Sequence, residues 1–70
     1  MNEETNKKKA NFYKNNQQLV HINLNNGKFY NGTIIELSSD FFIIKDRFLG
    51  ELPCFFVEIK DIEPYNEVEK

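Results

Sequence analysis

The sequence predicts a small all-β protein, a strongly bent five-stranded barrel, and two observations support this prediction. Apolar and polar residues alternate from Leu19 to Leu24, which is the period of a half-buried strand. Glycines follow at Gly27 and Gly32, where the first suits a hairpin turn and the second a sharp bend inside a strand. A chain of 70 residues has room for one such domain.

The N-terminal residues look different from the rest of the chain. Residues 1–10 are polar and charged and lack apolar periodicity, so the sequence predicts a flexible arm there. A short helix from Lys8 to Gln18 is compatible with the pattern, with Phe12 and Tyr13 as its only apolar anchors. We therefore expect the barrel domain at residues 11–66 and a frayed acidic tail at residues 67–70.

The turn after the first strand has two interpretations. A two-residue turn would pair Leu24 with Phe29. A three-residue loop, with Gly27 in the left-handed conformation, would pair Ile22 with Tyr30. We favour the three-residue loop because it sets the side chain of Tyr30 over the same face as Ile22.

Four further strands are expected after this turn. Gly32 interrupts the first of them and marks a bend. Arg47 to Pro53 reads as a hairpin tip, and Pro64 confines the last strand to an edge because proline has no N–H to donate. The expected strands are Lys28–Leu37, Asp40–Asp46, Cys54–Lys60 and Ile62–Tyr65, with a tight turn around Lys60–Asp61 before the last.

The expected third and fourth strands are apolar on both faces, which predicts an assembly. A chain this short has too few other residues to cover both faces of these strands. The single Cys54 reads as a small buried hydrophobe, and His21 has no companion ligand, so neither a disulfide nor a metal site is expected. Pairing of the fourth strand with the fifth strand of the next subunit would satisfy both open edges and generate a homo-oligomeric ring.

Composition narrows the function further. A net charge of −2 argues against indiscriminate coating of nucleic acid. No arrangement of residues fits a catalytic site or a cofactor-binding loop, so we expect neither an enzyme nor a cofactor. No apolar run resembles a signal peptide or membrane span, which predicts a soluble cytoplasmic protein without a membrane partner.

Two motifs then carry a family resemblance. The pattern Val20-x-Ile22-x-Leu24-x-Asn26-Gly27, followed by Tyr30-x-Gly32-Thr33-Ile34, resembles the Sm-like family, which includes the LSm, Hfq-like and archaeal Sm-like proteins. The segment Ile59-Lys60-Asp61-Ile62 is similar to the second family motif, with Asp61 in place of the usual small residue. The resemblance spans about Gln18 to Tyr65.

The resemblance implies a ring that holds single-stranded RNA at its pore. The site would combine the loop between strands two and three with the turn between strands four and five. Counting rigidly from Gly32, the family's base-stacking position falls on Asp40, whereas two extra residues in the preceding turn would move it to Phe42. Neither alignment supplies an Asn to read uridine. The residues implied as RNA-binding are Ser39, Asp40, Phe42, Lys60 and Asp61.

Two binding functions therefore stay open. The first is an RNA-binding Sm-like ring, with RNA chaperone activity as its expected role. The second is a protein-only assembly module in which the barrel has lost its RNA pocket. The basic N-terminal residues favour the first, whereas the missing Asn and the acidic C-terminal half favour the second.

Overall fold

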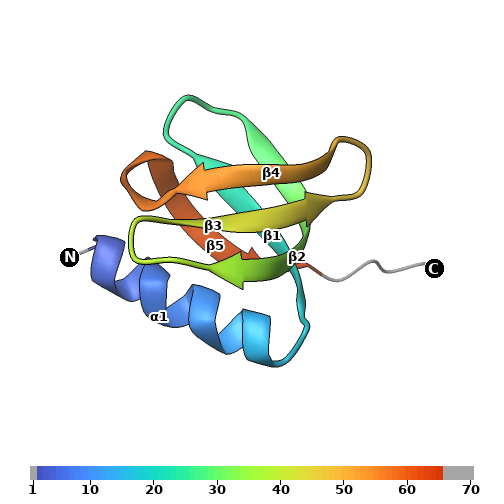
Figure 1. The fold of residues 1–70 in the computed structure, drawn as a ribbon. Helices are drawn as coiled ribbons and strands as arrows, with labels where there is room; N and C mark the ends of the chain where they lie inside the picture. The colour runs from blue at the N-terminus through green and yellow to red at the C-terminus, as the bar shows by residue number, and fades with distance from the viewer. Residues whose placement is uncertain (1, 66–70) are drawn as a thin grey trace.

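The computed structural model describes residues 2–65 as a five-stranded antiparallel sheet, strongly bent, with one helix against it (Figure 1). The strands lie in the order β4-β3-β2-β1-β5, which leaves β4 and β5 at the two edges of the sheet. The predicted all-β barrel is confirmed. The elements are α1 (Asn2–Asn15), β1 (Leu19–Leu24), β2 (Phe29–Leu37), β3 (Phe41–Asp46), β4 (Gly50–Phe55), the 3-10 turn η1 (Phe56–Glu58) and β5 (Ile59–Pro64).

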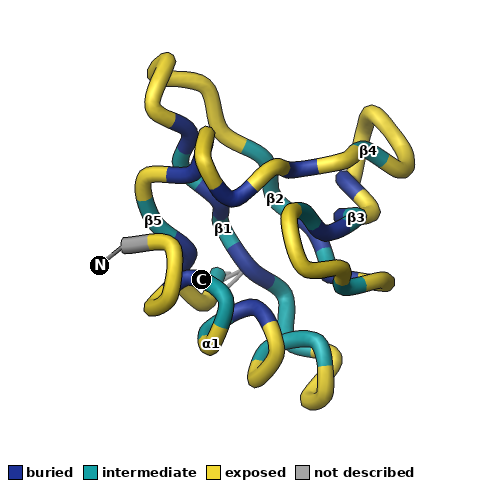
Figure 2. Tube along the Cα trace, turned by 60° about the vertical axis from the view of Figure 1, so that its left-hand side comes forward, coloured by how far each residue is buried: buried dark blue, intermediate teal, exposed yellow. Residues whose placement is uncertain are grey.

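Helix α1 corrects the prediction of a flexible arm over residues 1–10. It begins at Asn2 and ends at Asn15, and both Asn6 and Ala10 are buried. The buried part of α1 faces the sheet (Figure 2). The stripe that it buries is Asn6, Ala10 and Tyr13, whose spacing matches one helix face, but it contains too little apolar surface to appear as a periodic pattern. The expected tail at residues 67–70 lies outside the described residues, as does position 66.

The β1–β2 hairpin confirms the three-residue loop. Ile22 pairs with Tyr30 and Val20 with Gly32. Gly27 has a φ of 90°, which is the left-handed conformation that this loop requires and that glycine adopts without steric cost.

Gly32 and two β-bulges produce the strong bend. A Cβ atom placed on Gly32 would lie 2.0 Å from the carbonyl oxygen of Lys45, so β3 approaches here closer than any side chain allows. Ile35 is the extra residue of a bulge between β2 and β3, and Lys60 is the extra residue of a bulge between β1 and β5. Bulges increase local twist and curvature, and together with Gly32 they fold the sheet around its core.

The fourth and fifth strands differ from their predicted ranges. Strand β4 begins at Gly50 instead of Cys54, the chain reverses at η1 instead of at Lys60–Asp61, and β5 begins at Ile59. The alternation of buried and exposed residues continues from Cys54 to Val57, so the start of η1, where Phe56 is buried, resembled a continuing strand in the sequence.

The early start of β4 depends on Asp46. Its carboxylate accepts hydrogen bonds from the backbone N–H groups of Phe48 and Leu49, each at 2.9 Å, and from Asn31 at 3.2 Å. These bonds organise the connection from β3 to β4 within three residues. Burial acts to raise the pKa of Asp46, but the three backbone N–H donors and the charge of Arg47 outweigh it and hold the pKa below its ordinary value.

The depressed pKa of Asp46 predicts a pH-dependent contribution to stability. The folded state favours the charged carboxylate, so the stabilisation is present above the unfolded pKa of about 3.9 and is lost as pH falls through the folded pKa. We expect Asp46→Ala to lower the free energy of unfolding at pH 7 by about 1 to 3 kcal/mol, the range for lost bonds to a charged acceptor. Urea unfolding followed by circular dichroism at pH 7 and pH 3 checks this. A difference between the two proteins that is equally large at both pH values would contradict it.

The core lies inside the bend and draws on every strand (Figure 2). Cys54 is 2% exposed, and burial, with the nearby charges of Glu58 and Asp46, raises the pKa of its thiol to about 12, as expected for a small buried hydrophobe. The buried apolar residues are Ala10, Val20, Ile22, Leu24, Ile34, Phe42, Ile44, Cys54, Phe56, Ile59 and Ile62.

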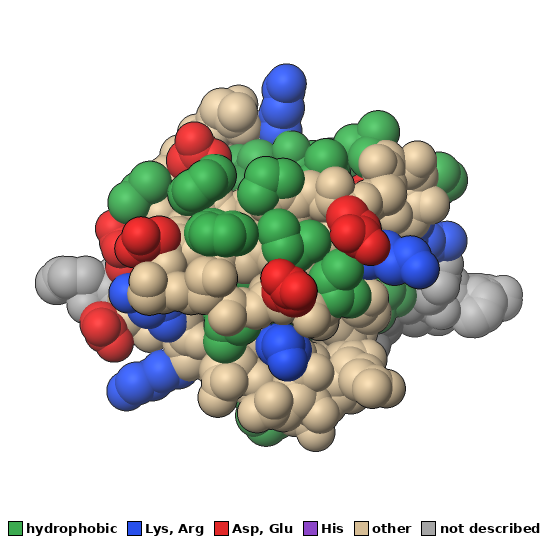
Figure 3. Space-filling model, in the orientation of Figure 1, with side chains coloured by type: hydrophobic (Ala, Val, Ile, Leu, Met, Phe, Trp, Pro, Cys, Tyr) green, Lys and Arg blue, Asp and Glu red, His purple; other side chains and the backbone are tan. Residues whose placement is uncertain are grey.

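A second apolar surface lies on the outer side of the β3–β4 hairpin. It consists of Phe41, Ile43, Pro53 and Phe55, which we call the outer hairpin face. The rings of Phe41 and Phe55 lie 5.2 Å apart, and Phe55 is 43% exposed. Hydrophobic side chains gather in a band over β3 and β4 in Figure 3. The β3–β4 hairpin is therefore apolar on both sides, as its sequence predicts.

Candidate nucleic-acid interface

Of the two turns expected to form the site, the one between β2 and β3 is present, whereas Lys60 and Asp61 lie in β5 and the chain turns earlier, at η1. Ser39 and Asp40 are exposed in the turn between β2 and β3. The carbonyl oxygen of Asp40 accepts a hydrogen bond of 2.9 Å from the backbone N–H of Phe56, the first residue of η1. The residues that the second turn brings beside Asp40 are thus those of η1, and not Lys60 and Asp61.

Phe42 is 0% exposed and packs edge-on against Phe56, with ring centroids 5.4 Å apart. A ring without accessible surface offers no plane on which a base can stack. The stacking role that the resemblance implied for Phe42 therefore has no support in this geometry, and Phe42 belongs to the core.

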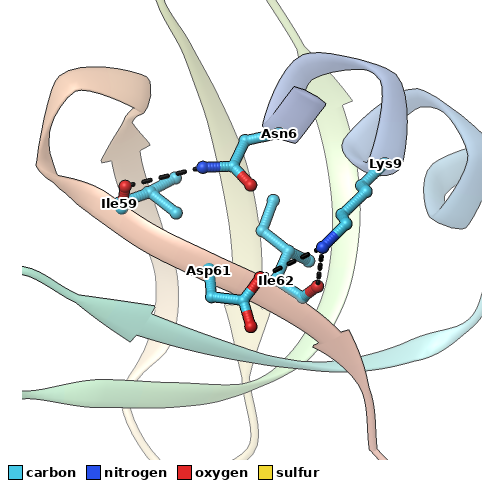
Figure 4. A network of polar contacts seen from close by, with 5 residues as sticks. All are labelled: Asn6, Lys9, Ile59, Asp61 and Ile62. Carbon is cyan, nitrogen blue, oxygen red and sulfur yellow. Dashed lines mark hydrogen bonds and ion pairs between the residues drawn. The ribbon is translucent and has the colours of Figure 1, made fainter. Parts of the chain in front are cut away.

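Lys60 and Asp61 lie within β5 instead of in a turn, which corrects their predicted placement. The Asp61 carboxylate forms an ion pair of 3.0 Å with Lys9 of α1, whose ammonium also donates to the carbonyl oxygen of Ile62 at 3.3 Å (Figure 4). Burial acts to raise the pKa of Asp61, but the hydrogen bond and charge of Lys9 outweigh it and lower the pKa. Asp61 thus helps to fix α1 to β5.

The rim formed by the two turns is acidic. Asp40 and Glu58 are both exposed there, and Val57 of η1 is 67% exposed. The ammonium of Lys7 lies 5.8 Å from the centroid of the buried Phe56 ring. Two exposed carboxylates disfavour a phosphate backbone at this rim.

Polar and aromatic side chains gather on a different surface, the outer side of β1 and β2. His21 lies opposite Asn31 in the ladder, and the ring nitrogens of His21 are hydrogen-bonded to the side-chain oxygens of Asn31 and Asn23. The centroids of the Phe29 and His21 rings lie 5.1 Å apart. The Tyr65 ring stacks on the His21 ring, with centroids 6.1 Å apart. We call this group of five residues the His21 face.

Two lysines stand beside the His21 face. An open pocket between the β1–β2 turn and β5 is lined by residues that include Asn23, Lys28, Lys60, Asp61 and Glu63. Lys60 is the extra residue of the bulge between β1 and β5, and it lines this pocket. Lys60 and Asp61 thus lie with the β1–β2 hairpin.

The sequence contains a signal for the His21 face that was not used. The favoured hairpin register, with Ile22 opposite Tyr30, also sets His21 opposite Asn31 and Asn23 opposite Phe29. The cross-strand pairs on the polar side of this hairpin therefore predict that these four residues lie together. Tyr65 joins them only because β5 pairs with β1, which short-range sequence patterns do not reveal.

Within residues 2–65 no three His, Cys, Asp or Glu side chains are grouped so that they could hold a metal ion. The same residues contain no helix that is long and apolar enough to cross a membrane.

A bent five-stranded antiparallel sheet with an N-terminal helix is the Sm-like fold, and comparison with solved structures agrees. The chain is similar to a crystal structure of the pleiotropic translational regulator Hfq, with a TM-score of 0.74 and 19% sequence identity over 84% of this chain and 97% of the Hfq chain. At this identity the likeness establishes the fold. Neither a family model nor a curated protein sequence matches the chain.

Proposed function

We propose that this protein binds single-stranded RNA as a homo-oligomeric ring. The observation that carries the RNA-binding part is the His21 face, where aromatic rings and side-chain amides lie together beside two lysines on an Sm-like fold. A fold alone does not define a function, so the proposal rests on what this surface offers to RNA.

The chemistry of the His21 face suits unpaired bases. Phe29 is 57% exposed and offers a stacking plane, and stacking on aromatic rings contributes to affinity for single strands together with contacts to the phosphate backbone. The amides of Asn23 and Asn31 supply donors and acceptors for base edges, and Lys28 and Lys60 supply charge for phosphates. We assign RNA to the His21 face because an exposed ring, two amides and two lysines gather there; Asp61 and Glu63 line the same pocket, so the carboxylates at the turn rim do not decide the assignment.

The ring rests on the two edge strands and the outer hairpin face. Unpaired edges with apolar neighbours are normally covered in native proteins. Pairing of β4 with β5 of the next subunit is heterologous, because each subunit uses two different edges, and such contacts form a ring when the rotation between subunits closes. The apolar outer hairpin face next to β4 supplies a hydrophobic contribution to the same contact.

The protein-only assembly module is the second candidate. The acidic turn rim and the burial of Phe42 favour it, because they remove the pore site that the family resemblance implied. It shares the proposed ring and differs only in the absence of RNA binding.

Fluorescence anisotropy with short oligo-A and oligo-U separates the two functions. We expect binding that weakens as salt increases. Phe29→Ala should reduce affinity about 5-fold or more, because stacking contributes about 1 to 3 kcal/mol per base. Lys60→Ala should reduce the salt dependence. Phe12→Ala is the matched control, since Phe12 is 61% exposed but lies on α1.

Each other result of this experiment has a defined meaning. Absence of binding to either oligonucleotide at low salt would refute RNA binding and favour the assembly module. Binding that survives Phe29→Ala but is lost in Ser39→Ala or Asp40→Ala would move the site to the turn rim.

A further inference from the structure

The imidazole ring of His21 lies between two side-chain amides. Its Nδ1 faces the side-chain oxygen of Asn31, the residue directly opposite on β2, and its Nε2 lies 3.1 Å from the side-chain oxygen of Asn23. An amide oxygen only accepts hydrogen bonds, so both ring nitrogens must donate. The imidazolium carries an N–H on each nitrogen, whereas the neutral ring carries only one. The arrangement of these three side chains is therefore that of the charged histidine.

Loss of the second proton changes what the ring requires. The nitrogen that gives up its proton would face an amide oxygen with lone pair against lone pair, which is repulsive. An amide that rotates by about 180° presents its NH₂ group to this nitrogen instead and restores the hydrogen bond. The rotation exchanges two groups of almost equal size, so it needs no further repacking. The neutral state of His21 thus requires one of the two amides to reverse.

Reversal of an amide changes the group that it directs away from His21. While both oxygens face the ring, the two NH₂ groups are the outward groups, and within residues 2–65 neither has a hydrogen-bond partner. After one amide reverses, its oxygen becomes the outward group. The face therefore offers two donors when His21 is charged, and one donor with one acceptor when His21 is neutral.

Asn23 is the amide that a ligand can reach. It lines the open pocket between the β1–β2 turn and β5, together with Lys28 and Lys60, whereas Asn31 does not line this pocket. An outward oxygen at Asn23 therefore meets solvent or a bound base beside the two lysines. Of the two amides, Asn23 is thus the one whose reversal changes what a ligand meets.

Charged groups surround His21 on both neighbouring strands. Glu63 of β5 lies directly opposite His21, and the Tyr65 ring stacks on the His21 ring. The other titratable or charged residues beside His21 and its two amides are Lys28, Asp46, Arg47, Lys60 and Asp61. Among these residue types only histidine ordinarily changes charge between pH 5 and 8, and the chain contains one histidine. A change of this face within that range is therefore due to His21.

We propose that His21 determines which base the His21 face prefers, because its protonation sets the group that Asn23 presents. This inference deepens the proposed function and rests on it, and His21 acts as a positioning residue, through Asn23. Two donors suit uracil, whose edge carries carbonyl oxygens. A donor beside an acceptor suits adenine, whose edge combines an amino group with a ring nitrogen acceptor. The preference for uracil over adenine therefore falls as pH increases through the titration of His21.

Fluorescence anisotropy with oligo-U and oligo-A at pH 5.5 and pH 8 tests this dependence. The charge of His21 attracts the phosphates of both oligonucleotides alike, so it cancels in the ratio of their affinities. We expect the affinity for oligo-U relative to oligo-A to fall about 2- to 10-fold from pH 5.5 to pH 8, which corresponds to one hydrogen bond. A ratio that is the same at both pH values would overturn the inference and leave RNA binding intact.

Two variants separate a positioning role from a structural one. His21→Phe keeps an aromatic ring next to Phe29 and Tyr65 but has no ring nitrogen, so we expect the same ratio at both pH values. Asn23→Asp presents an oxygen outward whatever the charge of His21, and we expect its ratio at both pH values to stay near that of the unmodified protein at pH 8. The added negative charge weakens binding of both oligonucleotides alike. A pH-dependent ratio that persists in His21→Phe would contradict the inference.

Nuclear magnetic resonance of the unmodified protein without RNA tests the side-chain network itself. We expect the side-chain NH₂ resonances of Asn23 to shift between pH 5.5 and pH 8 with the same midpoint as the ring resonances of His21. The NH₂ group of Asn16, which donates to Phe12 on α1, is the reference and should not shift. Resonances of Asn23 that do not follow His21 would overturn the inference, whatever the variants do. Absence of binding to both oligonucleotides at both pH values, with Asn23 following His21, would instead refute the proposed function and remove the base preference that rests on it.

Discussion

Gly32→Ala is expected to destabilise the protein by at least about 3 kcal/mol, at the upper end of the range for overpacking. The new Cβ would lie 2.0 Å from the carbonyl oxygen and 2.7 Å from the carbonyl carbon of Lys45, and 3.0 Å from the Cα of Asp46. All three are backbone atoms of β3, so no side-chain rotation relieves the contact. The strands must separate where the barrel bends.

The expected change is large because the protein is small. A domain of this size has a free energy of unfolding of only a few kcal/mol. A loss of 3 kcal/mol corresponds to a fall in Tm of roughly 12 to 24 °C. Thermal unfolding followed by circular dichroism measures it. Gly27→Ala is the matched control, since it meets no atom within 4 Å and carries only the strain of its φ of 90°, about 1 to 2 kcal/mol. An equal fall in Tm in both variants would show that the close approach of β3 at Gly32 does not cause the destabilisation.

Local chemistry made the first half of the barrel predictable. Gly27 and Gly32 each have a conformational or steric requirement that few other residues meet, and the alternation in β1 fixes which face is buried. These residues left two registers open for the β1–β2 hairpin, and the placement of Tyr30 over the face of Ile22 favoured the one observed. A short helix from Lys8 was expected, but the first part of α1 was missed because Asn6, a polar residue, occupies part of its buried stripe.

The ranges predicted for the second half of the barrel were displaced by two local effects. The start of β4 depends on the Asp46 carboxylate, which accepts hydrogen bonds from the backbone N–H groups two and three residues further on, a turn signal that the sequence prediction did not use. Phe56 is buried as a strand residue would be, although it lies in a 3-10 turn. These two effects displaced the predicted fourth strand toward the C-terminus.

The candidate site was predicted only in part, because its residues meet across strands that are distant in sequence. The sequence left two alignments open for the stacking position, and the burial of Phe42 in the core removes one of them. Lys60 was identified, but its neighbours are set by the bulge in β5 and not by a turn. The His21 face forms across three strands, so its composition emerges only when the sheet order is known.

Phe55→Asp is expected to convert the ring into folded monomers. Phe55 is 43% exposed in the isolated chain, so its replacement removes only the ring contact with Phe41 and lowers subunit stability by about 0.5 to 1.5 kcal/mol. In the proposed assembly the same position is covered by the partner subunit. Burying a carboxylate there without a counter-charge costs several kcal/mol. We therefore expect association of the subunits to weaken by about 100-fold or more.

Size-exclusion chromatography with light scattering measures the effect, and circular dichroism confirms that the variant is folded. We expect the unmodified protein to have a mass several times 8.3 kDa and Phe55→Asp to have the mass of one chain. Phe12→Asp is the control for a surface charge, because Phe12 is 61% exposed on α1 and lies on neither edge strand. A Phe55→Asp protein that keeps the full oligomeric mass would place Phe55 outside the interface. The exposed aromatic pair of the outer hairpin face would then require a different partner.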